Sequence, residues 1–328
     1  MKKIFVTLSS LFVFCILSVP AFAQNVQLGG QVVGVELSTR GVLVAGLSDV
    51  ETANGTVSPA SEAGIESGDI IISVNGETAD TASQIIDCLS RAQGESLELG
   101  IERQARSLSF SVRPALSNDG QWMLGLWLRD GLCGIGTLTF YEPDSGVFGA
   151  LGHGVNDNEH HLVPISEGSI TQAQVVSVEP GSSGTPGVLN GCADLGCELG
   201  SIVQNSVCGI FGLAYESLGG RTIETGFIAS GPASIVSTVS GSETREFSVE
   251  INKIISDADG THATLSVTDP VLLSLTGGIV QGMSGSPIIQ DGKLVGAVTH
   301  VYVSDPTRGY AVSIQDMLRE AGLEEQAA

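Results

Sequence analysis

Residues 277–300, GGIVQGMSGSPIIQDGKLVGAVTH, contain two apolar runs joined by Asp291-Gly292. An Asp-Gly pair between apolar runs is typical of a β-hairpin, because both turn positions favour residues that tolerate a positive φ. Just ahead of the first run, residues 282–287 place Ser284 in the sequence Gly-Met-Ser-Gly. This stretch therefore predicts a β-hairpin and singles out one serine as a candidate nucleophile.

The rest of the chain also favours a mainly β fold. It has 328 residues, 42% of them apolar, and its 43 glycines separate short Val/Ile/Leu/Thr-rich runs without a collagen period. From Leu116 onward these runs follow one another without long intervening helices, which predicts a β-barrel or a pair of barrels. Near the end, Ile314, Met317, Leu318 and Ala321 share one helical face and predict a closing helix.

Charge and the N-terminal segment bear on partners and location. The formal net charge is −22, so the chain lacks the basic stripe that nucleic acid or an anionic membrane surface requires. Residues 1–23 combine Lys2-Lys3, an apolar run and Ala21-Phe22-Ala23, which predicts a signal peptide cleaved after Ala23. An uncleaved signal anchor is the alternative, and membrane association is expected through this segment alone.

The cysteines outside the export segment are odd in number, so at least one thiol of a monomer stays unpaired. They are Cys88, Cys133, Cys192, Cys197 and Cys208. Cys192 flanks a short loop with Cys197 and is a candidate for a disulfide with it or with Cys208. No further ligands stand beside them at metal-binding spacing, so neither a metal nor a cofactor is expected.

A serine hydroxyl becomes a good nucleophile when an imidazole takes its proton. His153 follows an apolar strand and stands between glycines, so its ring has room to approach a reacting group. His300 closes the strand after Ser284 and is alternatively a core histidine. The glycines around the serine allow the N–H groups of Gly282 and Ser284 to converge as an oxyanion hole.

Residues 29–115 carry a separate pattern that includes SPASEAGIESGDIIISVNGE, residues 58–77. This block resembles a PDZ domain of bacterial exported proteases. The resemblance implies a peptide groove between a strand at residues 41–45 and a helix at residues 81–91, where an extended peptide from this chain or from a partner adds to a sheet edge. The peptide-binding residues are then expected to be Arg40, Gly41, Val42, Leu43 and Val44.

Residues 116–325 resemble the catalytic part of the SpoIVB peptidases, which are exported serine proteases of spore-forming bacteria. The likeness is carried by TFYEPDSGVFGALGHGVND (139–157), GSITQAQVVSVEPGSSGTPG (168–187) and residues 276–310. It implies a PDZ domain followed by a chymotrypsin-like double β-barrel. It also implies the catalytic residues, with His153 as general base, Ser284 as nucleophile and Asp269 as the acid. Asp157 and Asp194 are alternatives for the acid.

The residue before the serine is Met283, where digestive proteases have an aspartate that forms an activating salt bridge. We therefore expect activation by another route, through the PDZ domain or self-cleavage. The resemblance implies cleavage of a regulatory protein between mother cell and forespore, in sporulation signalling. The alternative is a non-catalytic PDZ adaptor with an inactive protease-like scaffold.

Overall fold

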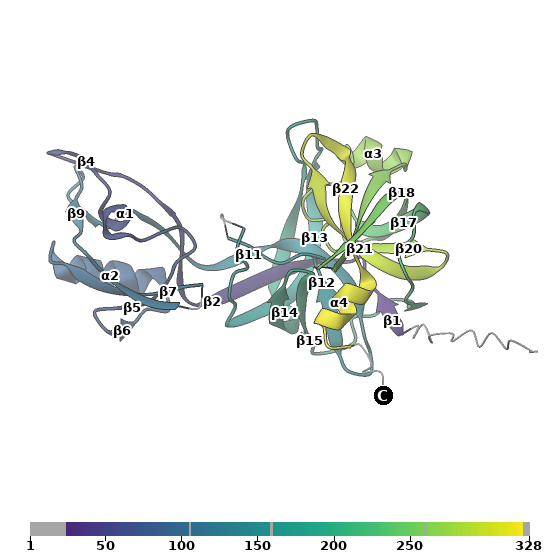
Figure 1. Cartoon of the computed structure of the whole chain (residues 1–328), viewed down its shortest axis with the longest axis horizontal. Coiled ribbons are helices and arrows are strands. Elements are labelled where there is room, and N and C mark those ends of the chain that lie inside the picture. Colours follow the sequence, from purple (N-terminus) through teal and green to yellow (C-terminus); the bar gives the residue numbers. More distant parts are fainter. Residues whose placement is uncertain (1–23, 105, 158–159, 259, 324–328) are drawn as a thin grey trace, which may run out of the picture.

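The computed structural model describes residues 24–104, 106–157, 160–258 and 260–323. The predicted signal peptide or anchor, residues 1–23, lies outside the described residues. The chain forms a small α/β unit and a larger β unit, joined by two long strands that run from one to the other (Figure 1). None of the helices in these described ranges is long and apolar enough to span a bilayer.

The first barrel of the larger unit is a ring of strands in which each pairs antiparallel with the next. In ring order these are β11 (Leu126–Tyr141), β12 (Val147–Ala150), β15 (Gly209–Ala214), β14 (Val188–Ser206), β13 (Glu167–Glu179) and β2 (Val32–Leu47). Pairing of β2 with β11 closes the ring. The short strands β1 (Asn25–Leu28) and β16 (Thr222–Glu224) extend the sheet beside β11.

The second barrel is also closed, and it contains the predicted hairpin around Asp291-Gly292. Its strands are β17 (Gly231–Thr238), β18 (Thr244–Asp257), β19 (Gly260–Val267), β22 (Asp305–Ser313), β21 (Lys293–Tyr302) and β20 (Pro287–Gln290). Asp291 and Gly292 both have positive φ between β20 and β21, as predicted for that turn. Helix α3 (Pro270–Thr276) precedes the serine loop, and α4 (Ile314–Glu320) is the predicted closing helix.

The small unit has the helix and strands expected of the PDZ pattern. Its elements are β3 (Val50–Thr52), β4 (Gly55–Val57), α1 (Pro59–Ala63), β5 (Ile70–Val74), β6 (Glu77–Thr78), α2 (Ala82–Ala92), β7 (Leu97–Arg103), β8 (Arg106–Val112), β9 (Ala115–Leu116) and β10 (Trp122–Met123). Thr81 caps α2 with a complete capping box, and Gly64 ends α1 at a φ of 93°.

The N-terminal boundary of the PDZ domain differs from the expected residue 29. Val32 to Ser38 of β2 pair with β11 and β13, so they belong to the first barrel. Further along the same strand, Val42 and Leu43 pair with β5 of the small unit. The small unit is therefore inserted between two neighbouring strands of the first barrel, and β2 and β11 each serve both units.

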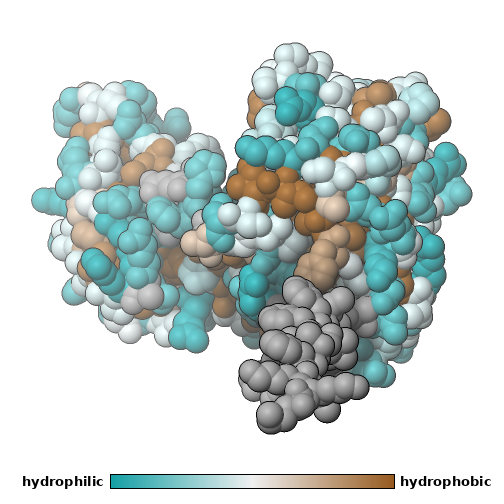
Figure 2. All heavy atoms as spheres, turned by 45° about the vertical axis from the view of Figure 1, so that its right-hand side comes forward, coloured by the Kyte–Doolittle hydropathy of each residue, from teal (hydrophilic) through white to brown (hydrophobic). Residues whose placement is uncertain are grey.

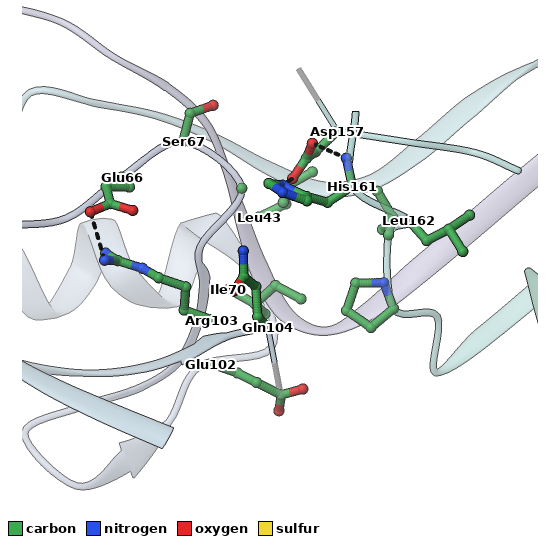
Figure 3. A pocket seen from close by; sticks show the side chains of 13 residues that line it. Leu43, Glu66, Ser67, Ile70, Glu102, Arg103, Gln104, Asp157, His161 and Leu162 are labelled. Atoms are coloured by element: carbon green, nitrogen blue, oxygen red, sulfur yellow. Dashed lines mark hydrogen bonds and ion pairs between the residues drawn. The ribbon is translucent and has the colours of Figure 1, made fainter. Parts of the chain in front are cut away.

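Figure 2 shows a largely hydrophilic exterior with scattered hydrophobic patches, and a hollow between the two units. A cavity of about 170 Å³ lies between the small unit and the segment that follows His153. Leu43, Ile70 and Gln104 face Asp157 and His161 across it (Figure 3).

Because Leu124 and the start of β11 complete the small unit, we expect a fragment of residues 39–130 to fold by itself and one of residues 39–116 to fold poorly. Leu124 is buried in the core of this unit, and its carbonyl accepts from the Ala60 amide. Urea unfolding followed by circular dichroism checks this. Equal unfolding midpoints for the two fragments would contradict it.

Candidate active site

The Ser284 loop lies where the two barrels meet and is fixed by hydrogen bonds from both. From the first barrel, the Thr137 amide donates to the Ser284 carbonyl at 2.9 Å, and the Thr137 hydroxyl donates to the Gly282 carbonyl at 2.9 Å. From the second, the Val298 carbonyl accepts from the Gly285 amide at 2.7 Å. The loop is therefore held at both ends of the nucleophile motif.

Gly285 has no room for a side chain. Its φ is 94°, and a Cβ atom would lie 2.1 Å from the Thr137 carbonyl oxygen and 2.5 Å from the Leu151 nitrogen. This close approach joins the serine loop to the segment that leads into His153. Ser284 and the segment leading into His153 therefore meet where the two barrels join.

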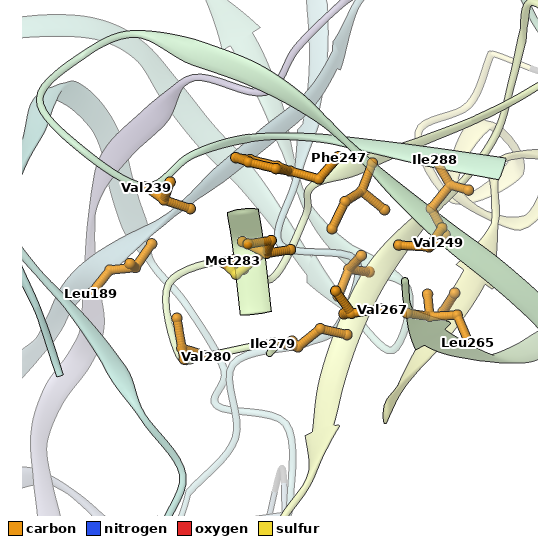
Figure 4. Packing of buried hydrophobic residues seen from close by; sticks show 14 of the residues in the cluster. Leu189, Val239, Phe247, Val249, Leu265, Val267, Ile279, Val280, Met283 and Ile288 are labelled. Carbon is orange, nitrogen blue, oxygen red and sulfur yellow. The ribbon is translucent and has the colours of Figure 1, made fainter. Parts of the chain in front are cut away.

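Met283 anchors the loop by burial instead of by charge. Its side chain is 0% exposed and packs among Leu189, Val280, Phe247 and other apolar residues (Figure 4). Complete burial of a methionine stabilises by roughly 1.5–3 kcal/mol. An aspartate here would lie unpaired in an apolar core, so this position is incompatible with the activating salt bridge of digestive proteases.

The amides of Gly282 and Ser284 meet the requirements of an oxyanion hole. Within the described part of the chain, neither donates a hydrogen bond, whereas the intervening Met283 amide donates to the Val280 carbonyl. Gly282 has a φ of 97°. Two unpaired N–H groups beside a serine hydroxyl are suited to stabilise the charge that develops on a substrate carbonyl oxygen.

His153 sits three residues beyond β12 and is in the tautomer that a general base needs. Its Nδ1 lies 2.8 Å from the Gly154 carbonyl oxygen, which can only accept, so Nδ1 carries the proton and Nε2 keeps its lone pair. The ring stacks against that of His300, with centroids 4.3 Å apart and an interplanar angle of 31°.

The serine hydroxyl makes its hydrogen bond elsewhere in this structure. Ser284 Oγ donates to the carbonyl oxygen of Thr299 at 2.6 Å. Thr299 immediately precedes His300, whose ring contacts that of His153. Turning the Ser284 hydroxyl from this carbonyl toward His153 is the rearrangement that a productive pair requires.

Asp269 occupies a different position from that expected of the triad acid. Its carboxylate caps α3 by accepting from the amides of Val271 and Leu272, and it also accepts from the Ser248 amide. The alternatives are also engaged locally, Asp157 with His161 and Asp194 with the Gly196 amide. Among the described residues, no carboxylate is hydrogen-bonded to His153, whose orientation comes from a backbone carbonyl.

Three of the five peptide-binding residues expected from the sequence, Val42, Leu43 and Val44, already have strand partners. Val42 and Leu43 pair with β5 on one side, and Leu43, Val44 and Leu47 pair with β11 on the other. At Leu43 both edges of β2 are occupied, and Val42 and Val44 are 0% exposed. Binding of a peptide at Arg40 and Gly41 stays a prediction. The alternation of Leu124, Leu126 and Leu128 was the sequence signal for the extra strand.

The cysteines form no disulfide in the part of the chain that the structure covers. Cys88, Cys133, Cys192, Cys197 and Cys208 are free thiols, so the candidate bridge between Cys192 and its neighbours is not formed. Burial raises the pKa of the Cys208 thiol to about 11, with smaller contributions from Asp316 and Glu320. This thiol is therefore a core residue and not a nucleophile.

A double barrel with a serine, an imidazole and two free amides at its junction defines the serine peptidase class. The family model for SpoIVB peptidase S55 matches residues 120–318, and one for PDZ domains matches residues 55–103. The chain belongs to the SpoIVB peptidase S55 family.

Solved structures of the Rv3671c protease from M. tuberculosis are also similar to this chain. The inactive form matches with a TM-score of 0.35 and 13% identity, over 57% of this chain and 84% of that one. The active form matches with a TM-score of 0.34 and 14% identity, over 60% and 78%.

Replacement of Asp269 by serine should separate helix capping from catalysis. Serine is a good N-cap, so we expect Asp269→Ser to keep the stability of the protein and to lose less than about tenfold in kcat/KM. Asp269→Ala should lose about 1 kcal/mol of stability with its cap. A loss approaching about 10⁴-fold in the folded serine variant would instead identify Asp269 as the triad acid.

The activity should persist into mildly acidic solution. Burial lowers the pKa of His153, partly offset by its hydrogen bond to Gly154, and burial together with His153 lowers that of His300 to about 4. Because the neutral ring is the base, activity is present above the lowered pKa of His153 and is lost as pH falls through it. A kcat/KM profile should place the acid limb below about 6.5, the ordinary histidine value. An acid limb above that value would contradict the burial argument.

Proposed function

We propose that this serine peptidase is an exported endopeptidase that cleaves a regulatory protein. Ser284 is the nucleophile, His153 the general base and acid, and the amides of Gly282 and Ser284 the oxyanion hole. The observation that carries the proposal is that the Ser284 loop meets the segment leading into His153, while the amides of Gly282 and Ser284 donate no hydrogen bond among the described residues. The predicted signal segment supports export.

The proposed setting is sporulation signalling in the space between mother cell and forespore. It is supported by membership of the SpoIVB peptidase S55 family. The PDZ domain controls activity or access of the substrate, which is consistent with the strands it shares with the first barrel. Self-cleavage ahead of β1 would remove the N-terminal segment and leave this strand in place, since β1 begins at Asn25.

The reaction follows from the placement of these groups. His153 Nε2 takes the proton of Ser284 as Oγ attacks the scissile carbonyl, and the two amides hold the resulting oxyanion. The imidazolium then gives its proton to the leaving amine, and water repeats the sequence to release the acyl group. Each donor of the oxyanion hole contributes about 3–4 kcal/mol to lowering the barrier.

A fluorophosphonate label tests this proposal against the non-catalytic adaptor. We expect the wild type to be modified at Ser284, with Ser284→Ala and His153→Ala unlabelled. His161→Ala is the matched control, because this histidine contacts Asp157 away from the serine and should leave labelling unchanged. Tandem mass spectrometry locates the adduct. A wild type that stays unlabelled, with or without added C-terminal peptides, would favour the adaptor.

A further inference from the structure

The edge of β11 that faces away from β2 is unpaired over much of its length. On this edge, pairing of β11 with β12 begins at Leu138, beyond the residues that contact the active-site loop. From Gly125 to Gly136, the described residues provide no strand partner on that edge, while β2 pairs along the other. An open edge of this length is a template for an added strand.

One end of this edge lies in the PDZ domain. Leu126 and Leu128 pack with Ile85 and Leu89 of α2 in one core cluster. Gly125 turns the chain there with a φ of 76°, and its amide donates to no acceptor among the described residues. The start of the edge therefore combines a helix, apolar side chains and a free N–H group.

The other end reaches the oxyanion hole. Thr137 contacts Gly282 and Ser284 directly, and a cavity of about 640 Å³ lies beside Gly282. Cys133, Gly134 and Ile135 of β11 line this cavity. Thr171 also lines it; this residue is 2% exposed, and its hydroxyl has no hydrogen-bond partner in the described structure. A buried, unpartnered hydroxyl is a group that a bound peptide can satisfy.

We propose that the free edge of β11 is one continuous track for the C-terminal side of the substrate, from the scissile bond at Ser284 to a free carboxylate at Gly125. The inference rests on the proposed function and names the part of the substrate that the PDZ domain holds. The cavity at Ile135 receives side chains just beyond the scissile bond, and α2 grips the apolar C-terminal residue.

Antiparallel addition of the peptide, as in every existing pairing of β11, gives the track this direction. All pairings of β11 are antiparallel, and β11 runs from Gly125 toward Thr137. An antiparallel peptide therefore runs from the Ser284 end to the Gly125 end, so its C-terminus arrives at the PDZ domain. About ten residue steps from Gly125 to Ile135 span roughly 33 Å at about 3.3 Å per residue. The track thus sets the distance between the cleaved bond and the C-terminus.

A hydrogen bond must open for the track to be used. Asp130 of β11 accepts from the Ala82 amide at the start of α2, at 2.5 Å, and this contact is solvent-exposed. It crosses from the strand to the helix that would grip the peptide. Replacement of Asp130 by alanine should therefore tighten the binding of C-terminal peptides to the full-length protein, measured by fluorescence anisotropy.

Cleavage of a peptide library by the full-length enzyme tests the track. The library contains random peptides of about 25 residues with free C-termini, and a matched set has amidated C-termini. We expect cuts to concentrate about 10–13 residues from the free C-terminus, with the concentration lost on amidation. Ser284 labelling by fluorophosphonate is measured in parallel.

Thiol modification supplies a second readout. In a Cys15→Ser, Cys88→Ala, Cys192→Ser, Cys197→Ser background, Cys133 remains as the exposed thiol of the described residues, while Cys208 is buried. A bulky maleimide on Cys133 should lower kcat/KM for long peptides by about tenfold or more and leave fluorophosphonate labelling unchanged. The same background with Cys133→Ser is the matched control and should not respond to the reagent.

The outcomes distinguish this inference from the proposed function. Cuts unrelated to the C-terminus, in an enzyme that labels normally at Ser284, overturn the track alone. An unchanged kcat/KM after complete modification of Cys133 does the same. Failure of Ser284 to label overturns the proposed function, and the track with it.

Discussion

The antiparallel pairing of β2 with β11 is the interaction on which the rest of the structure depends. It closes the first barrel between Val32 and Ser38 of β2, and it completes the PDZ sheet between Leu43 and Leu47. Because the same two strands continue through both units, separating the PDZ domain from the barrel requires breaking this ladder. The pairing also carries Thr137 to the Ser284 loop, so one constraint positions the domain and the nucleophile together.

The proposed oxyanion hole needs no ion pair because the loop is held by other means. The hydroxyls of Thr137 and Thr139 donate to the carbonyls of Gly282 and Gly285. These bonds direct the carbonyl oxygens to the first barrel and away from the position where a substrate oxyanion would be repelled. Burial of Met283 fixes the residue between them. The proposed mechanism also requires a hydrogen bond between Ser284 and His153, which have other partners in this structure.

Local signals in the sequence predicted much of the fold. The Asp291-Gly292 turn, the Thr81 cap of α2 and the apolar strands all depend on near neighbours in the chain, and the structure has them. The partner of β2 depends on residues some 80 positions away, and an apolar strand pattern does not specify which strand lies beside it. For this reason the sequence did not predict that Val42, Leu43 and Val44 already have strand partners.

The same limit explains why the sequence alone did not distinguish the two possible roles of Asp269. An aspartate before a proline satisfies both the pattern of a triad acid and that of an N-cap, and only the surrounding fold distinguishes them. The structure favours the cap, which leaves His153 oriented by Gly154 and stacked on His300. A neutral His300, with its lowered pKa, adds no positive charge beside the imidazolium that forms during catalysis. The base is therefore kept neutral at rest by burial, while a carbonyl dipole supplies the orientation that a carboxylate provides in other serine peptidases.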